Sequence, residues 1–305
     1  MRGAQAGTAP PVAKHVAELS GRSAIVSGGS RGLGFAISSA FLGAGMEVLI
    51  CGREGETLAR AQAELTNGAP AGSRCLAEVA DVGRPADVDR VVARALEAFG
   101  KIDVLVNNAG ILGPTGPVET VEWEEWVEAL RVNLFGSVSF CRAVLPHMKS
   151  RRAGKIIQLS GGGATSPMPG MSAYAASKAA VVRFVETLAG ETQEWGIAVN
   201  AMAPGALNTR LLDEVLAAGP EKVGKAYYER ALRQRESGGA PPSRGAELAL
   251  FLASSASDGI TGKLVSAIWD PWSELGSHVD DLAGTDVYAL RRILPADRGL
   301  KWGEG

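Results

Sequence analysis

Tyr174 and Lys178 are the two side chains of this sequence best placed to do chemistry. They lie four residues apart, and residues at that spacing share one face of a helix. An ammonium beside a phenol favours the phenolate, so we expect the pKa of the tyrosine to fall below its ordinary value of about 10. Such a tyrosine exchanges a proton with an alcohol or ketone oxygen near neutral pH. The same spacing is common on helix surfaces, so the prediction depends on the rest of the sequence.

A glycine-rich loop, Ser27–Gly34, precedes this pair by about 145 residues. It follows a short apolar strand pattern and leads into apolar residues at helical spacing. Glycines let the backbone approach a pyrophosphate, and the helix N-terminus offers free N–H groups. The spacing is Gly-x-x-x-Gly-x-Gly, and a simple turn is the alternative because the chain has 39 glycines. The residues predicted to bind a dinucleotide here are Gly28, Ser30, Arg31, Gly32, Leu33 and Gly34.

Arg31 and Arg53 indicate which dinucleotide binds. A site for NAD usually has Asp or Glu about 20 residues beyond the loop, where it accepts the ribose 2′-hydroxyl. Here Arg53 follows the next predicted strand. Two guanidiniums suit a 2′-phosphate, which they can hold bidentately. The pair therefore predicts NADP(H), although Glu54 weakens the preference and two solvated surface arginines are the alternative.

Together these motifs resemble the short-chain dehydrogenase/reductase family, in its single-domain branch, over roughly residues 20–268. Tyr174 and Lys178 match the family's catalytic pair, and Asn133 matches the asparagine that supports the lysine through water. The resemblance implies further cofactor contacts at the adenine, at the centre of the sheet and beside the nicotinamide. Those contacts are Asp81, Val82, Asn108, Ala109, Gly110, Pro204, Gly205 and Thr209.

One position departs from the family's pattern. The catalytic serine of the family lies 13 residues before the tyrosine, where this sequence has Gly161. We expect Ser160, one residue earlier, to serve in its place, because three consecutive glycines allow an unusual backbone path. Alternation along a strand would instead point Ser160 away from the site. The open alternatives are Thr165, Ser166, Ser172 or a site that works with Tyr174 alone.

Composition restricts the class of protein. The chain has 305 residues and is 46% hydrophobic, enough for one large core. Its 31 basic and 33 acidic residues give no reason to expect nucleic acid or a membrane as a partner. Three dispersed cysteines indicate free thiols and a cytoplasmic location. Isolated histidines predict no metal site, and no apolar stretch is long enough for a transmembrane helix.

Strand-like and helix-like segments alternate, which predicts an α/β fold: a doubly wound parallel sheet of the Rossmann type in one domain. The strands are expected at 23–28, 47–51, 73–79, 102–106, 154–160, 197–201 and 263–268. The helices are expected mainly at 31–44, 86–99, 122–148, 172–194 and 244–254. The predicted parts are a flexible N-terminal tail (1–18), the domain (19–268) with a substrate lid at 206–240, and a C-terminal extension (269–305).

The extension begins with two tryptophans, Trp269 and Trp272, and its residues 270–281 include four acids and no Lys or Arg. Tryptophans beside carboxylates often bind carbohydrate, so a sugar, aminosugar or cyclitol ketone is the expected substrate, with closure of the substrate pocket as the role of the extension. The alternative is that the extension packs on its own subunit, with the tryptophans as anchors.

These observations predict an NADPH-dependent ketoreductase, or the reverse alcohol dehydrogenase, acting on a small-molecule ketone or alcohol. Tyr174 would donate the proton, Lys178 would lower its pKa and hold the nicotinamide ribose, and Asn133 would order the proton relay. The alternatives are NAD-dependent oxidation of a hydrophobic or acyl substrate, and a non-catalytic NADP-binding scaffold, which Gly161 favours. The resemblance also implies a homodimer or homotetramer.

Overall fold

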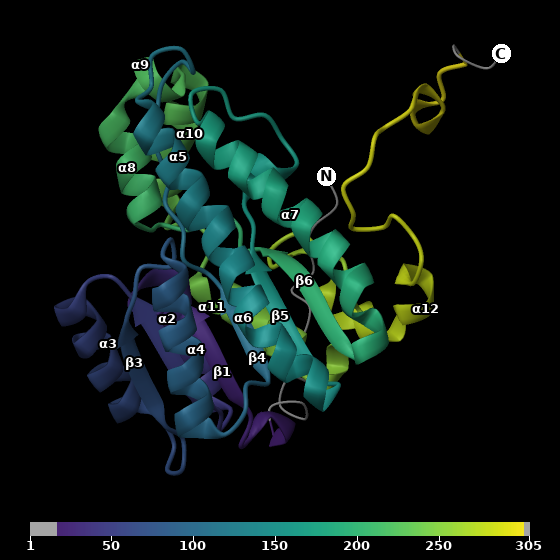
Figure 1. The fold of residues 1–305 in the computed structure, drawn as a ribbon. Helices are drawn as coiled ribbons and strands as arrows, with labels where there is room; N and C mark the ends of the chain where they lie inside the picture. The colour runs from purple at the N-terminus through teal and green to yellow at the C-terminus, as the bar shows by residue number, and fades with distance from the viewer. Residues whose placement is uncertain (1–16, 302–305) are drawn as a thin grey trace.

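A parallel sheet of seven strands forms the centre of the computed structural model, which describes residues 17–301. The strand order is β3-β2-β1-β4-β5-β6-β7, and every neighbouring pair is parallel (Figure 1). The order reverses between β1 and β4, which is where doubly wound sheets bind ligands. The predicted fold class is confirmed. The strands are β1 (Ser23–Ser27), β2 (Glu47–Gly52), β3 (Cys75–Val79), β4 (Val104–Asn107), β5 (Gly154–Leu159), β6 (Ile197–Ala203) and β7 (Leu264–Ser266).

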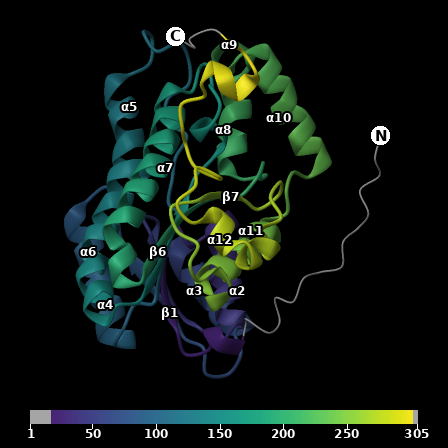
Figure 2. The same ribbon diagram turned by 90° about the vertical axis from the view of Figure 1, so that its right-hand side faces the viewer.

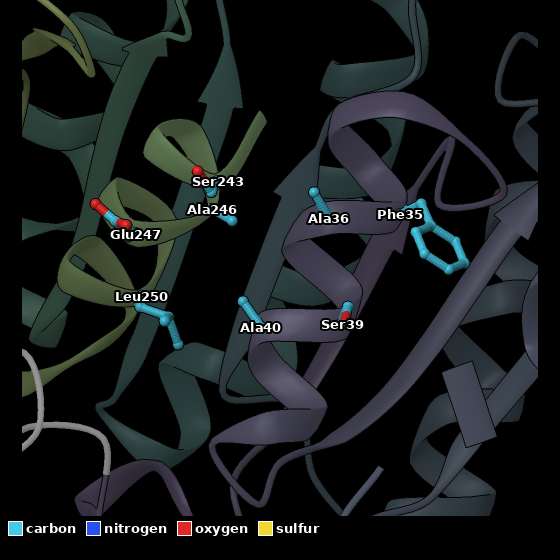
Figure 3. Close-up of a pocket in the computed structure, with 8 residues that line it drawn as sticks. All are labelled: Phe35, Ala36, Ser39, Ala40, Ser243, Ala246, Glu247 and Leu250. Atoms are coloured by element: carbon cyan, nitrogen blue, oxygen red, sulfur yellow. The ribbon is translucent and has the colours of Figure 1, made fainter. Parts of the chain in front are cut away.

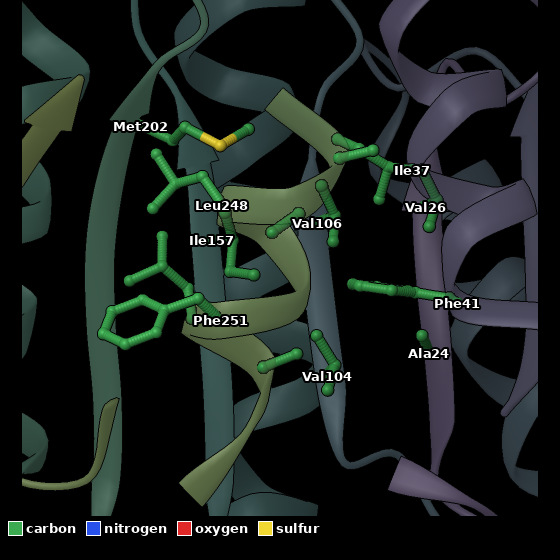
Figure 4. Close-up of a cluster of buried hydrophobic side chains, with 14 of the residues drawn as sticks. Ala24, Val26, Ile37, Phe41, Val104, Val106, Ile157, Met202, Leu248 and Phe251 are labelled. Carbon is green, nitrogen blue, oxygen red and sulfur yellow. The ribbon is translucent and has the colours of Figure 1, made fainter. Parts of the chain in front are cut away.

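Helices cover both faces of the sheet, so the central strands are apolar on both sides. One core lies between the sheet and α2, α3 and α11, and Figure 4 shows strand residues such as Val26 and Val106 directed toward Phe41 and Leu248. The other core lies between the sheet and α4, α6 and α7. The helices that build these layers are α2 (Gly32–Gly43), α3 (Gly55–Gly68), α4 (Pro85–Phe99), α6 (Gly136–Arg151), α7 (Ser172–Thr192) and α11 (Pro242–Ala253).

The single helix expected at 122–148 is interrupted. It consists of α5 (Trp123–Leu130), a π-helical segment at Arg131–Phe135, and α6. Asn133 lies at the centre of the π-helical segment. Its side chain accepts the N–H of Ile111 at 2.8 Å and donates to the carbonyl of the same residue at 2.9 Å. Widened turns of this kind occur often at functional sites, and this one fixes Asn133 to the loop after β4.

The predicted lid region folds into three helices, α8 (Arg210–Ala218), α9 (Pro220–Val223) and α10 (Lys225–Ser237). They gather at the end of the fold where α7 begins (Figure 1). Contact with the body is close, because a Cβ atom added to Gly170, just before α7, would lie 2.2 Å from the carbonyl oxygen of Lys222. The lid helices therefore rest on the loop that leads to Tyr174.

The C-terminal extension packs on its own subunit. The Trp272 side chain is 2% exposed, its indole N–H donates to the carbonyl of Ala267 at 3.2 Å, and its ring centroid lies 5.7 Å from that of Phe251. Further along, the N–H of Leu264 in β7 donates to the carbonyl of Tyr288 at 2.8 Å. Figure 2 shows the extension, including α12 (Val279–Leu282), on the β7 side of the sheet. The extension thus covers a sheet edge that would otherwise expose unpaired backbone groups.

At the N-terminus, residues 1–16 of the predicted tail lie outside the described part of the chain. Glu18 was predicted to belong to that tail, but its carboxylate accepts both the N–H of Ser255, at 3.1 Å, and its hydroxyl, at 2.8 Å. Glu18 is therefore held against the domain by Ser255. Within residues 17–301, no helix is long and apolar enough to span a bilayer.

The buried Trp272 predicts that the extension contributes to stability. We expect Trp272→Ala to lower the free energy of unfolding by about 3–5 kcal/mol, the usual cost of truncating a buried aromatic side chain to alanine. Trp269 is 84% exposed, so Trp269→Ala is the matched control and should change stability by less than about 0.5 kcal/mol. Urea unfolding of both variants gives the comparison. Equal stabilities for the two would contradict the role of Trp272 as an anchor.

Candidate active site

The glycine-rich loop forms a backbone cradle at the carboxyl end of β1. Gly28 and Gly32 have φ angles of +64° and +54°, which favour glycine. A Cβ atom at Gly34 would lie 2.3 Å from the carbonyl oxygen of Gly28, so no larger residue fits there without a shift. The first-turn amides of α2 have no intrahelical acceptor. This combination fits the pyrophosphate of a dinucleotide.

The turn after β4 is fixed to this loop by Ser27 and Asn108. The Asn108 amide donates to the carbonyls of Ser27, at 2.9 Å, and Gly28, at 3.1 Å. In return, the Ser27 hydroxyl accepts the N–H groups of Asn108, at 3.0 Å, and Ala109, at 3.1 Å. Ser27 was not predicted to have a role of its own, although its place as the last residue of the first strand could have indicated one.

Other predicted cofactor residues lie along the same edge of the sheet. A Cβ atom at Gly32 would lie 3.5 Å from the methyl group of Thr209, so the glycine loop and the start of α8 are neighbours. Gly205 has a φ angle of +91° and lies against Ile268. The carboxylate of Asp81, which follows β3, accepts the N–H of Gly83 at 2.9 Å. The contacts of these residues with a cofactor stay predictions, as do those of Ser30, Leu33, Val82 and Pro204.

The two arginines predicted to bind a 2′-phosphate differ in their surroundings. Arg31 donates to the carboxylate of Glu54 at 2.7 Å, and Arg210 of α8 lies 3.8 Å from the same oxygen. The hydrogen bond and charge of Arg31 lower the pKa of Glu54. Arg53 is exposed and makes no ion pair within residues 17–301. Glu54 therefore competes with any phosphate for Arg31, while Arg53 is free to bind one.

Tyr174 and Lys178 share one face of α7, as predicted. The Lys178 amine lies 5.6 Å from the centroid of the Tyr174 ring and donates to the carbonyl of Leu159 at 3.0 Å. Lys178 is only 5% exposed, and burial lowers its pKa to about 8. No carboxylate forms an ion pair with it among the described residues. The buried amine is thus held at the end of β5, facing the ring of Tyr174.

The predicted direction of the tyrosine pKa is wrong for the ligand-free chain. Burial, followed by the neighbouring phenol of Tyr227, raises the pKa of Tyr174 to about 12. The Lys178 amine lies 5.6 Å from the centroid of the Tyr174 ring, and burial disfavours the charged form of both groups. Loss of solvent therefore outweighs the cation in setting the acidity of this phenol.

Asn133 is connected to Tyr174 through Ser177. The Asn133 amide donates to the Ser177 hydroxyl at 2.9 Å, and that hydroxyl donates to the carbonyl of Tyr174 at 2.7 Å. A Cβ atom at Gly110 would lie 3.3 Å from the Asn133 side-chain oxygen and 3.6 Å from the Lys178 amine. The structure thus brings Asn133, Lys178 and Gly110 together. Ser177 was not predicted, although it lies directly before the lysine.

Gly161, and not Ser160, faces the phenol. A Cβ atom at Gly161 would lie 2.5 Å from the hydroxyl oxygen of Tyr174. The Ser160 hydroxyl is buried and has no hydrogen-bond partner within residues 17–301, so it makes no hydrogen bond to Tyr174. The prediction that Ser160 replaces the missing serine gains no contact from this geometry and stays a prediction. Thr165 and Ser166 are exposed, and the Ser172 hydroxyl accepts the indole N–H of Trp126 at 3.1 Å.

Apolar side chains surround Tyr174. Tyr174 packs with residues from the loops after β4 and before α7 and from all three lid helices. The buried members of this lid cluster are Leu112, Met171, Leu212, Val215, Val223 and Ala231, and its partly buried members include Met168, Leu211, Tyr227 and Tyr228. The surroundings of Tyr174 are therefore largely apolar.

The tryptophans and acids of the extension do not form the expected sugar site in this subunit. The Trp272 ring is in the core, and the Asp270 carboxylate accepts the N–H of Ser266 at 2.6 Å. Trp269 is exposed. Among residues 17–301 no other aromatic ring stacks with it, so the two tryptophans do not form a common surface for a sugar. Trp272 matches the alternative interpretation, in which the extension packs on its own subunit, whereas Trp269 is no anchor.

A hollow of about 390 Å³ lies elsewhere, between α2 and α11 (Figure 3). Small and apolar side chains line it, among them Ala36, Ala40 and Leu250. These helices cover the face of the sheet opposite α7. The hollow contains none of the predicted site residues.

Comparison with known proteins agrees with this geometry. The family model for short chain dehydrogenases matches residues 22–218. The chain belongs to the short-chain dehydrogenase family. The oxidoreductase UcpA of Escherichia coli (strain K12) is 36% identical over 253 residues, covering 80% of this chain and 92% of that protein. The L-fucose dehydrogenase of Oryctolagus cuniculus is 34% identical over 242 residues, covering 79% and 82%. The 3beta-hydroxysteroid dehydrogenase 1 of Eggerthella lenta is 37% identical over 248 residues, covering 80% and 91%.

Solved structures of the family superpose well on the chain. Levodione reductase gives a TM-score of 0.75 at 28% identity, covering 85% of this chain and 98% of that one. NAD+-bound xylitol dehydrogenase gives 0.74 at 25% identity, covering 82% and 98%. A gluconate 5-dehydrogenase from Burkholderia cenocepacia, in complex with NADP and tartrate, gives 0.71 at 29% identity, covering 82% and 96%. These similarities identify the chain as an oxidoreductase that uses a nicotinamide cofactor.

The buried Lys178 predicts a measurable cost to stability. Its pKa falls from 10.5 to about 8 on folding, which corresponds to roughly 3 kcal/mol. The unfolded chain therefore binds more protons between those two values, and stability rises with pH across that window. In the ligand-free protein at pH 7, Lys178→Met should raise the free energy of unfolding by up to roughly 3 kcal/mol. The difference from the wild type should shrink between pH 8 and pH 10.5.

Urea unfolding at several pH values measures this difference. Lys225→Met removes an exposed lysine and is the matched control, with little change expected. A Lys178→Met protein that is less stable than the wild type at pH 7 would contradict burial as the dominant effect on this amine.

Proposed function

We propose that this chain is an NADP(H)-dependent ketone reductase that can also run as an alcohol dehydrogenase. The observation that carries the proposal is the buried pair Tyr174 and Lys178, which Ser177 connects to Asn133 at the edge of the sheet where the glycine loop lies. A non-catalytic scaffold would have no need to bury an amine without a counter-charge. The homodimer or homotetramer and the cytoplasmic location implied by the sequence belong to the same proposal.

The geometry suggests how each residue acts. When bound, the nicotinamide supplies the hydride to the carbonyl carbon, and the carbonyl oxygen takes up the electron pair of the broken π bond. Tyr174 donates its proton to that oxygen. The phenolate left behind is the stronger base, because the pKa values of Tyr174 and Lys178 are about 12 and about 8. The proton therefore returns from the side of Lys178, where Asn133 orders the relay.

The proposed preference for NADP(H) depends on cations near the predicted 2′-phosphate. Arg53 is free, whereas Arg31 can turn to a phosphate only by leaving Glu54. Among the structural relatives, one is bound to NAD+ and another to NADP. The Arg31–Glu54 pair favours the second candidate, an NAD-dependent alcohol oxidation, because a carboxylate at this place suits a ribose hydroxyl.

The lid cluster supports a substrate with an apolar body. Its buried side chains are aliphatic, and its polar groups are the hydroxyls of tyrosines. We therefore favour a hydrophobic ketone over the sugar or cyclitol ketone expected from the extension. A relative named for L-fucose and one named for a 3β-hydroxysteroid show that both kinds of substrate name occur among proteins of similar sequence.

Loss of the phenol tests the proposed reaction. With NADPH and a panel of ketones such as acetophenone and cyclohexanone, Tyr174→Phe should lower turnover by roughly 10²-fold or more, the scale of general acid catalysis. The affinity for NADPH, measured by fluorescence titration, should stay nearly unchanged. Tyr288→Phe in the extension is the control and should behave like the wild type. A folded Tyr174→Phe protein with normal turnover would overturn the assignment.

Removal of the free arginine tests the cofactor preference. A lost charge-assisted contact to phosphate costs about 1.5–3 kcal/mol, so Arg53→Ala should weaken NADPH binding by roughly 10- to 150-fold. NADH binding should barely change. Glu54→Gln, which frees Arg31, should strengthen NADPH binding relative to NADH. Equal losses for both cofactors in Arg53→Ala would contradict the proposed 2′-phosphate site.

A further inference from the structure

Within residues 17–301, no side-chain hydroxyl forms a hydrogen bond with the Tyr174 hydroxyl. A carbonyl oxygen that gains negative charge during hydride transfer is stabilised by a second hydrogen-bond donor. Gly161 has no side chain to supply one, and the Ser160 hydroxyl makes no hydrogen bond to Tyr174. The Ser172 hydroxyl accepts the indole N–H of Trp126 in α5, and this bond holds its oxygen toward that helix. A hydroxyl carried by another part of the chain that packs near Tyr174 could supply this donor.

Tyr227, on lid helix α10, has the properties of such a donor. It is partly buried and packs against the same lid cluster as Tyr174. Its hydroxyl makes no hydrogen bond to any residue in the range 17–301. The guanidinium of Arg230 lies 5.0 Å from the centroid of its ring and holds the aromatic plane from the side of α10. After burial, the Tyr227 phenol is the second cause that raises the pKa of Tyr174.

We propose that Tyr227 replaces the missing serine by donating a hydrogen bond to the substrate carbonyl oxygen. The inference rests on the proposed ketone reduction and adds a second catalytic residue to it. Tyr227 keeps its proton throughout, while Tyr174 transfers its own. Because Tyr227 belongs to the lid, the donor reaches the carbonyl only when the lid covers the site.

This proposal agrees with the crowding at position 161 and with the place of Tyr227 on a lid helix. The hydroxyl of Tyr174 occupies the space in which a side chain at position 161 would begin, since a Cβ atom there would lie 2.5 Å from it. A donor on lid helix α10 does not need the space beside Gly161, so it avoids that crowding. Closure of the lid also removes water from the site, and this strengthens each hydrogen bond to the developing charge.

The experiment compares single hydroxyl deletions with a ketone that the wild type reduces with NADPH. Removal of one such donor typically lowers turnover by about 10²–10³-fold, so Tyr227→Phe should show a loss on that scale with little change in KM or in NADPH affinity. Tyr228→Phe, in the same helix and the same cluster, should lose much less turnover. Tyr288→Phe, in the extension, is the control that should match the wild type. Ser160→Ala should also be nearly silent.

The outcomes separate the alternatives. A silent Tyr227→Phe with an impaired Tyr227→Leu would show that the ring only packs in the lid, and would overturn the proposal. An impaired Ser160→Ala beside a silent Tyr227→Phe would return the role to Ser160. Absence of ketone reduction by the wild type itself would count against the proposed function, and titration of NADPH would still show whether the cofactor site is intact. Equal losses in Tyr227→Phe and Tyr228→Phe would indicate general lid damage and would also overturn it.

Discussion

The buried amine of Lys178 is the constraint on which the rest of the site depends. It has no carboxylate partner among residues 17–301 and is held by one hydrogen bond, to the carbonyl of Leu159. That carbonyl is available because β5 ends there, and the amine reaches it because α7 begins at the same edge of the sheet. The chain therefore maintains an energetically costly group at the point where strands β1, β4 and β5 end together. Such a cost is common where function requires it.

Burial also links the lid to the chemistry of the phenol. The lid helices close the apolar cluster around Tyr174, and the loss of solvent raises the pKa of that residue while it lowers the pKa of Lys178. The two shifts have opposite directions because one group is charged when it loses a proton and the other when it holds one. A proton is therefore held on Tyr174 until a carbonyl oxygen becomes basic enough to take it. Burial sets this order of acidities, and in the proposed mechanism Tyr227 supplies a second hydroxyl.

Much of the fold could be predicted from local pattern. The strands were expected within about two residues of their observed bounds, because apolar runs bounded by glycine are typical of buried parallel strands. The positions of Gly28 and Gly32 followed from backbone freedom, and the shared face of Tyr174 and Lys178 followed from helix geometry. What could not be predicted depends on residues distant in sequence. The pairing of Arg31 with Glu54, the anchoring of Trp272 and the facing of Gly161 toward the phenol all need the assembled structure. The pKa direction failed for the same reason, since spacing reveals the cation but not the loss of water around both groups.

Direct titration of the phenol is the measurement that tests this account most directly. The chain has four tyrosines, so ¹³C labelling at Cζ and the Tyr174→Phe variant would assign the Tyr174 resonance in the ligand-free protein. Because burial dominates, the account predicts a pKa near 12, well above the ordinary value of about 10. A pKa at or below 10 would show that Lys178 outweighs burial, and would contradict the account.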